Sequence, residues 1–103
     1  MKQLSSQQTQ ELMMLHQQGN IEAAAEMSKK LIKDYPKELM LHNILGVCQE
    51  AKGDLEGAAT SYQNAININP NIPELQFNLG AMLHALNNIA SSKNTAETMK
   101  ATK

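Results

Sequence analysis

Apolar side chains recur along most of this chain at the three- and four-residue spacing of an amphipathic helix. The clearest stretch covers residues 39–72, in which two such patterns are separated by a Gly-Asp turn at residues 53–54 and closed by Pro70. The apolar positions of the two patterns are Leu41, Ile44, Leu45 and Cys48, followed by Leu55, Ala58, Ala59, Tyr62, Ala65 and Ile66. We therefore expect a helical hairpin that packs closely, with the small residues Gly46 and Ala58 at the helix crossing.

The segments on both sides of this hairpin carry the same pattern. We expect a first helix at residues 5–18, capped by Ser5 or Ser6, and a second at residues 21–34, ended by a Tyr-Pro pair. A further helix is expected to begin near Pro73. The apolar positions of these three helices are Leu4, Leu12, Met14 and Leu15; Ala23, Ala24, Met27, Leu31 and Ile32; and Leu75, Leu79, Met82, Leu83 and Leu86.

The hairpin pattern recurs with a fixed period. A separation of 34 residues relates Gly19 to Gly53, Ala24 to Ala58, Pro36 to Pro70 and Gly46 to Gly80. This period, with the order helix, turn, helix and proline, resembles the tetratricopeptide repeat family. The residues that carry the resemblance are Leu45-Gly46, Gly53, Ala58, Tyr62, Ala65 and Pro70, whereas His42 and Gln49 stand where the family often has Trp and Tyr.

The resemblance implies an all-α fold, a right-handed superhelical solenoid of antiparallel helix pairs. A single domain would span residues 1–103, with repeats at about 5–38, 39–72 and 73–103, the third of them degenerate. In that third repeat a pair of asparagines at 87–88 replaces the turn glycine, and the apolar residues that follow are Ile89, Ala90, Ala96 and Met99. We expect this segment to form a short polar capping helix, with a frayed tail as the alternative. Because so thin a cap covers little apolar surface, we also expect weak self-association through the C-terminal end.

In the family, the first helix of each repeat lines a concave groove that receives a peptide or a partner's surface. The resemblance therefore implies these partner-binding residues: Thr9, Met13 and His16; Asn43, Val47 and Glu50; Phe77, Ala81 and His84. Their apolar members favour binding by apolar contact, with Phe77 as the anchor. Some members grip an acidic C-terminus with Lys, Asn and Arg, but the matching positions here are Thr9, Met13, Ile44, Glu74 and Asn78. A charge-based grip on a carboxylate is therefore not expected.

The composition points away from several classes of partner. The net charge is −1, and the lysines at 29, 30 and 33 form a solvated helix face rather than a stripe interleaved with aromatic residues. We therefore expect no nucleic-acid or membrane partner. The N-terminal residues lack the apolar run of a signal peptide and no stretch is apolar enough to span a membrane, so a cytoplasmic location is expected.

The polar residues suggest little chemistry. His16, Glu50 and His84 occupy one repeat position, but a shared metal ion needs ligands at about 2 Å, whereas packed helices lie roughly 10 Å apart. They are better interpreted as a polar line along the groove. His42 is expected to be half-buried and to serve packing alone, and the single cysteine, Cys48, to be an inert core residue. No catalytic or phosphate-binding motif is present, so we expect neither a cofactor nor an enzyme.

Two functions remain open. The first is a stand-alone module for protein–protein interaction. The alternative is the N-terminal, substrate-recruiting segment of a larger enzyme, because the spacing of leucine, proline and glycine from Leu31 to Asp54 looks similar to segments that precede bacterial glycosyltransferase or sulfotransferase domains.

Overall fold

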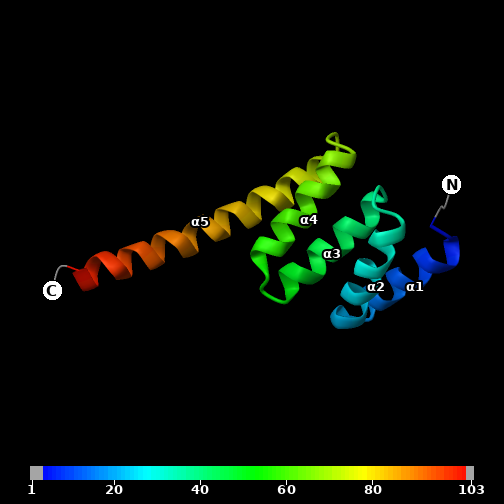
Figure 1. Ribbon diagram of the computed structural model, residues 1–103, viewed down its shortest axis with the longest axis horizontal. Helices are drawn as coiled ribbons and strands as arrows, with labels where there is room; N and C mark the ends of the chain where they lie inside the picture. Colours follow the sequence, from blue (N-terminus) through cyan, green and yellow to red (C-terminus); the bar gives the residue numbers. More distant parts are fainter. Residues whose placement is uncertain (1–3, 102–103) are drawn as a thin grey trace.

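The computed structural model describes the backbone of residues 4–101 and the side chains of residues 4–88. Helices follow one another along the chain (Figure 1), and no strand occurs within the described backbone. They are α1 (Ser6–Gln17), α2 (Ile21–Asp34), α3 (Leu39–Ala51), α4 (Leu55–Ile68) and α5 (Pro73–Ala101). Each helix packs against the next in the chain, which gives an elongated array with extents of 61 × 29 × 21 Å. The predicted all-α repeat solenoid is confirmed.

Two glycines turn the chain between paired helices. Gly19 has a φ of 75° and Gly53 a φ of 83°, a left-handed conformation that any side chain disfavours. The residue after each glycine, Asn20 or Asp54, caps the next helix with a side-chain oxygen that accepts a hydrogen bond from a backbone N–H three residues on. The Gly-Asn and Gly-Asp pairs therefore end one helix and begin the next. At the start of the chain, Ser5 caps α1 in the same way, as the sequence predicts.

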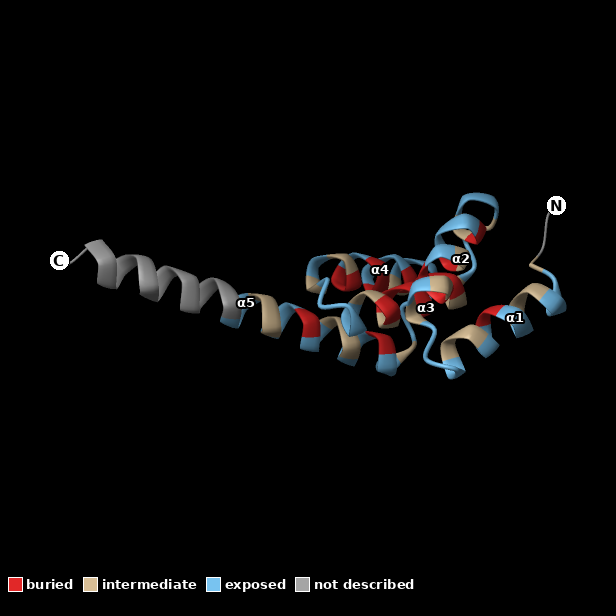
Figure 2. Cartoon of the chain, turned by 90° about the horizontal axis from the view of Figure 1, so that it is seen from below, coloured by how far each residue is buried: buried red, intermediate tan, exposed pale blue. Residues whose placement is uncertain are grey.

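The apolar faces of neighbouring helices form two core clusters, one across α1, α2 and α3 and one across α4 and α5 (Figure 2). The buried members are Leu12, Ala24, Ala25, Leu31, Leu41, Ile44, Leu45 and Cys48 in the first, and Ala58, Ala59, Tyr62, Ala65, Leu75 and Met82 in the second. All four core positions predicted for α3 are buried, and four of the six predicted for α4 are buried with the other two half-buried. Helical periodicity thus predicted which side of each central helix packs.

His42 is buried rather than half-buried as the sequence suggested, and packing is not its only role. Its Nε2 lies 2.8 Å from the carbonyl oxygen of Pro36. A carbonyl can only accept, so the ring nitrogen donates the hydrogen bond. The histidine therefore fastens the loop before α3 to the helix.

The paired helices α3 and α4 approach each other closely at Gly46. A Cβ at this glycine would be 2.8 Å from Cε1 of Tyr62, too short for a real contact. The predicted close packing at Gly46 is present, and the group against it is the ring of Tyr62, while Ala58 is buried nearby on the same helix. Only glycine at this position lets the buried tyrosine lie directly against the α3 backbone.

The third repeat departs from the sequence prediction, because α5 continues through residues 87–88 without a turn. A separate capping helix was expected there. The position that corresponds to Gly53 is Asn87, and no described residue other than glycine has a positive φ, so the left-handed turn is not made and the helix continues. The apolar anchors predicted for that cap, Ile89, Ala90, Ala96 and Met99, lie outside the described side chains.

Two residues predicted to pack are exposed, one at each end of the array. Met14 on α1 is 55% exposed, although Cys48 at the equivalent position of α3 is buried in the cluster that α3 forms with α2. Leu83 on α5 is 53% exposed. The reason is the same in both cases: the described chain has no helix before α1 and none folded back onto α5 to cover these side chains.

Candidate partner-binding face

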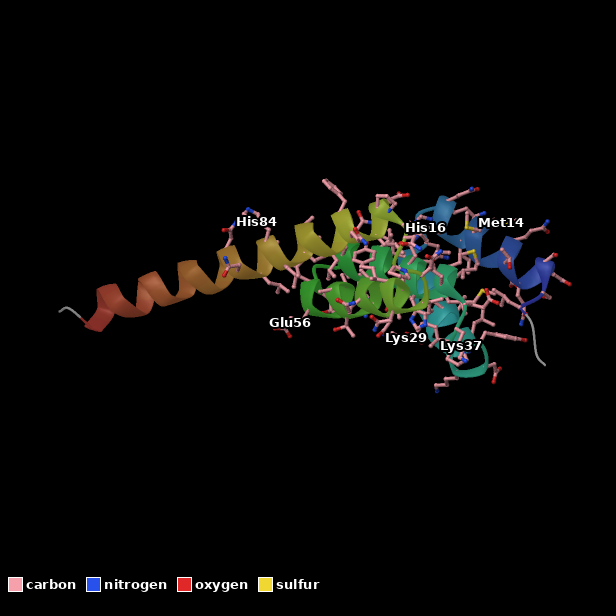
Figure 3. The ribbon with its side chains drawn as sticks, turned by 90° about the horizontal axis from the view of Figure 1, so that it is seen from above. Met14, His16, Lys29, Lys37, Glu56 and His84 are labelled. Carbon is pink, nitrogen blue, oxygen red and sulfur yellow. The ribbon has the colours of Figure 1, made fainter. Side chains whose placement is uncertain are left out.

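The helices alternate between two sides of the molecule, with α1, α3 and α5 along one side and α2 and α4 along the other (Figure 2). Figure 3 shows the same division in the side chains: His16 and His84 lie on one side, and Lys29, Lys37 and Glu56 lie on the opposite side. The histidines belong to α1 and α5, the first helices of their repeats, which is the arrangement that the sequence predicts for the partner-binding side.

We call the nine predicted binding residues the partner face: Thr9, Met13, His16, Asn43, Val47, Glu50, Phe77, Ala81 and His84. Three come from each of α1, α3 and α5, spaced at i, i+4 and i+7, so that each helix contributes one continuous stripe. None of the nine is a buried core residue. Met13, Glu50, Phe77, Ala81 and His84 are exposed, and Thr9, His16, Asn43 and Val47 are half-buried.

Phe77 is the most exposed large apolar residue of the described chain. Its side chain is 76% accessible to solvent, and it begins the stripe on α5. At that exposure the ring does not pack between repeats. A phenylalanine exposed to this extent keeps most of its apolar surface in contact with water, which is unfavourable.

Glu50, in the middle of the partner face, is held from the opposite side of the array. The hydroxyl of the buried Tyr62 on α4 donates to Oε1 of Glu50 at 3.0 Å. Burial raises the pKa of Tyr62 well above its usual value, and the hydrogen bond and the charge of Glu50 raise that pKa further. The tyrosine therefore remains a donor. The sequence did not predict this hydrogen bond. The signal that could have indicated it is the aromatic position of the repeat, where Tyr62 carries a hydroxyl long enough to reach α3.

Asn43 has a buried amide oxygen that the described fold leaves without a donor. Its Oδ1 is buried and has no hydrogen-bond partner among the described residues. Thr9, at the equivalent position of α1, instead turns its hydroxyl back to the carbonyl of Ser5 at 3.0 Å. The two equivalent residues thus differ, because the Thr9 hydroxyl donates within its own helix whereas the amide oxygen of Asn43 is buried and unpaired within the described chain.

Two models of repeat families match the chain. One, described as a TPR repeat, matches residues 51–87, and the other, described as a tetratricopeptide repeat, matches residues 12–38. Together they cover more than half of the sequence, including the turns at Gly19 and Gly53. The chain belongs to the tetratricopeptide repeat (TPR) family. The match at 51–87 begins at the end of α3 and extends into α5 as far as the missing turn, so the last recognisable TPR unit ends where the helix fails to fold back.

A curated protein with a related segment is the probable biofilm formation methyltransferase WspC of Pseudomonas putida. It is 27% identical over 79 residues, which cover 77% of this TPR chain and 19% of WspC. The chain thus spans about a fifth of the length of the relative that it matches. The relative is a methyltransferase rather than a glycosyltransferase or sulfotransferase.

Two features that bear on chemistry can be checked in the described part of the TPR chain, a metal-binding cluster and the single thiol. No three His, Cys, Asp or Glu side chains gather there closely enough to hold a metal ion. Burial raises the pKa of the Cys48 thiol, and the opposing effect of Lys52 is smaller, so the nucleophilic thiolate is disfavoured. Among the described residues, no helix combines the length and apolar character needed to cross a membrane.

Proposed function

We propose that this TPR chain, a protein-interaction module by its family, binds a segment of a partner protein on the partner face, mainly by apolar contact. The observation that carries the proposal is the exposure of Phe77 on the α5 stripe of the partner face, whose other apolar residues Met13, Val47 and Ala81 occupy one repeat position and are half-buried or exposed. An aromatic anchor beside smaller apolar side chains is a common centre of binding energy in such interfaces. The proposal gives this chain no catalytic residue and takes the partner to be a cytoplasmic protein.

The charges of the partner face support apolar recognition. Glu50 is its only carboxylate, there is no Lys or Arg, and one oxygen of that carboxylate already accepts from Tyr62. A partner therefore meets a nearly neutral surface, and we expect an affinity that changes little with salt. Asn43 can supply direction, because an amide side chain both donates to and accepts from a peptide backbone, although its buried Oδ1 has to turn outward to accept.

The test begins with partners recovered by pull-down and uses Phe77→Ala against Lys29→Ala, a change on the opposite side. We expect Phe77→Ala to weaken binding by about 2 kcal/mol, roughly 30-fold, and to leave the melting temperature nearly unchanged because the ring is exposed. Lys29→Ala should affect neither quantity. A Phe77→Ala variant with reduced stability and intact affinity would reject the proposal, as would an affinity that falls steeply with salt.

A second possibility is that the module recruits a substrate protein to an enzyme in the same polypeptide. The match to about a fifth of a methyltransferase favours it over an isolated module, and glycosyltransferase or sulfotransferase domains remain alternatives for the attached enzyme. The first test is whether the reading frame continues beyond Lys103. If it does, Phe77→Ala in the longer protein should raise KM for the protein substrate and leave kcat unchanged, since the partner face would act in binding alone.

A further inference from the structure

The first helix of the third repeat presents a surface that its counterpart in the second repeat keeps covered. In the second repeat, Gly46 of α3 lies against Tyr62 of α4. The equivalent residue of α5 is Gly80, and no side chain or backbone atom from beyond its own stretch of helix lies within 4 Å of the Cβ position at this glycine. Because α5 does not turn at residues 87–88, no second helix lies on this surface within the described chain.

The uncovered surface, which we call the open face of α5, consists of Leu79, Gly80, Leu83 and Leu86. Leu83 is exposed and the other two leucines are half-buried at the edge of the contact with α4. The leucines are spaced by four and three residues, the spacing by which two long helices pack side by side. The glycine between them allows the backbone of another helix to approach closely.

The sequence that follows is only partly suited to cover this face. Of the six packing positions of α4, Leu55, Tyr62 and Ala65 keep apolar equivalents 34 residues on, whereas Ala58, Ala59 and Ile66 are replaced. The apolar equivalents are Ile89, Ala96 and Met99, and the replacements are Ser92, Lys93 and Lys100. A fold-back of residues 89–101 would therefore place a hydroxyl and two ammonium groups where α4 uses apolar side chains, which is unfavourable. The single continuous helix of α5 agrees with this sequence.

The charge pattern of α5 favours a second copy as the occupant. Residues 75–92 contain no Asp, Glu, Lys or Arg, so two copies of the open face meet without like-charge repulsion, and a charged partner finds nothing to pair with. Also, α5 extends beyond the other four helices (Figure 1). In an antiparallel pair the two sets of α1–α4 would therefore lie at opposite ends and would not collide.

We propose that the open face of α5 is a self-association surface, on which α5 of a second copy packs antiparallel around a two-fold axis. Such an interface is isologous and closes at the dimer, because each copy uses the same surface. It is separate from the partner face, whose stripe on α5 begins at Phe77, so the dimer would carry two partner faces.

The test is sedimentation velocity of the 103-residue chain over a wide range of concentration. We expect a monomer–dimer equilibrium for the wild type. Leu83→Glu should weaken dimerisation roughly tenfold or more, since two carboxylates would be brought together across the pair. Leu83 is exposed, so the variant should remain folded, which a thermal melt checks. Mixing Leu83→Glu with Leu83→Lys should restore association as a heterodimer.

Met14→Glu is the matched control, because Met14 is equally exposed but lies at the other end of the array. It should dimerise like the wild type. If Met14→Glu and Leu83→Glu weaken association equally, copies stack head to tail and the two-fold pair is wrong. A wild type that stays monomeric at every concentration, or a folded Leu83→Glu that dimerises normally, also overturns the proposal.

Discussion

Where paired helices cross, the large residue and the small residue change places from one repeat to the next. In the second repeat the small Gly46 on α3 meets the large Tyr62 on α4. At the equivalent positions of the first repeat, the large Leu12 is on α1 and the small Ser28 on α2, and both are fully buried. Each pair thus combines one large and one small residue, so similar crossings are filled by opposite choices.

The contact at Gly46 gives a prediction in which one substitution has opposite effects at two equivalent glycines. Gly46→Ala places a methyl group against the buried Tyr62 ring, and we expect a net loss of about 1 kcal/mol in the free energy of unfolding after the gain in helix propensity. Gly80→Ala meets no neighbour and should raise stability by up to about 1 kcal/mol. Urea melts at low protein concentration measure both. Equal stabilisation by the two changes would show that the close contact at Gly46 is wrong.

Between elements, α3 and α4 are joined by buried or half-buried hydrogen bonds as well as by apolar packing. Tyr62 donates to Glu50, and the hydroxyl of Ser61 donates to Oε1 of Gln49 at 2.6 Å. Both donors are buried on α4 and both acceptors project from α3. These bonds fix the rotation of the two helices relative to each other, and one of them also positions a carboxylate of the partner face.

The raised pKa of Tyr62 predicts sensitivity to alkaline pH. The unfolded tyrosine ionises near pH 10, whereas the folded one resists ionisation, so above about pH 10 the unfolded state loses a proton first and stability falls as the pH rises. Below that pH the stabilising contribution of the neutral Tyr62 is fully present. Tyr62→Phe should lose stability less steeply over this range. Tyr35→Phe, which changes the only other tyrosine, serves as the control and should follow the wild type. Identical slopes for Tyr62→Phe and the wild type would contradict the assignment.

Some features of the helices could be predicted from the sequence and others could not. Periodicity located the helices and the buried side of α3, because burial of one apolar side imposes a 3.6-residue pattern. It could not show that Met14 and Leu83 are exposed, since a pattern identifies the apolar side of a helix and not whether a neighbour covers it. The partner face followed from the repeat register alone. The hydrogen bond from Tyr62 to Glu50 depends on the reach of a side chain between helices, which no linear pattern encodes.

At the scale of the whole molecule, stability is distributed along the array, since each helix packs mainly on its neighbours in sequence. No single core joins the first repeat to α5: the cluster around Leu12 and that around Tyr62 have different buried members. Local unfolding at one end should therefore leave the other end largely intact.

Leu12→Ala tests this independence. Removing a fully buried leucine should cost about 2–5 kcal/mol, and the loss should fall on the first repeat. In hydrogen exchange we expect the amides of α1 and α2 to lose protection while those of α4 and the first part of α5 keep most of theirs. Uniform loss of protection through all the helices would instead indicate a single cooperative unit.

The left-handed turn at Gly53 and the Gly46–Tyr62 contact both lie within residues 39–72, one period of the chain. That segment is therefore a portable unit for protein engineering. If it were duplicated after Ile72, the inserted helices would meet α4 as α5 now does and would offer α5 a copy of the surface that it already fits. The molecule could be lengthened one repeat at a time, and each insertion would add an Asn43, a Val47 and a Glu50 to the partner face. The only new interface would be that between the inserted copy of α3 and α4.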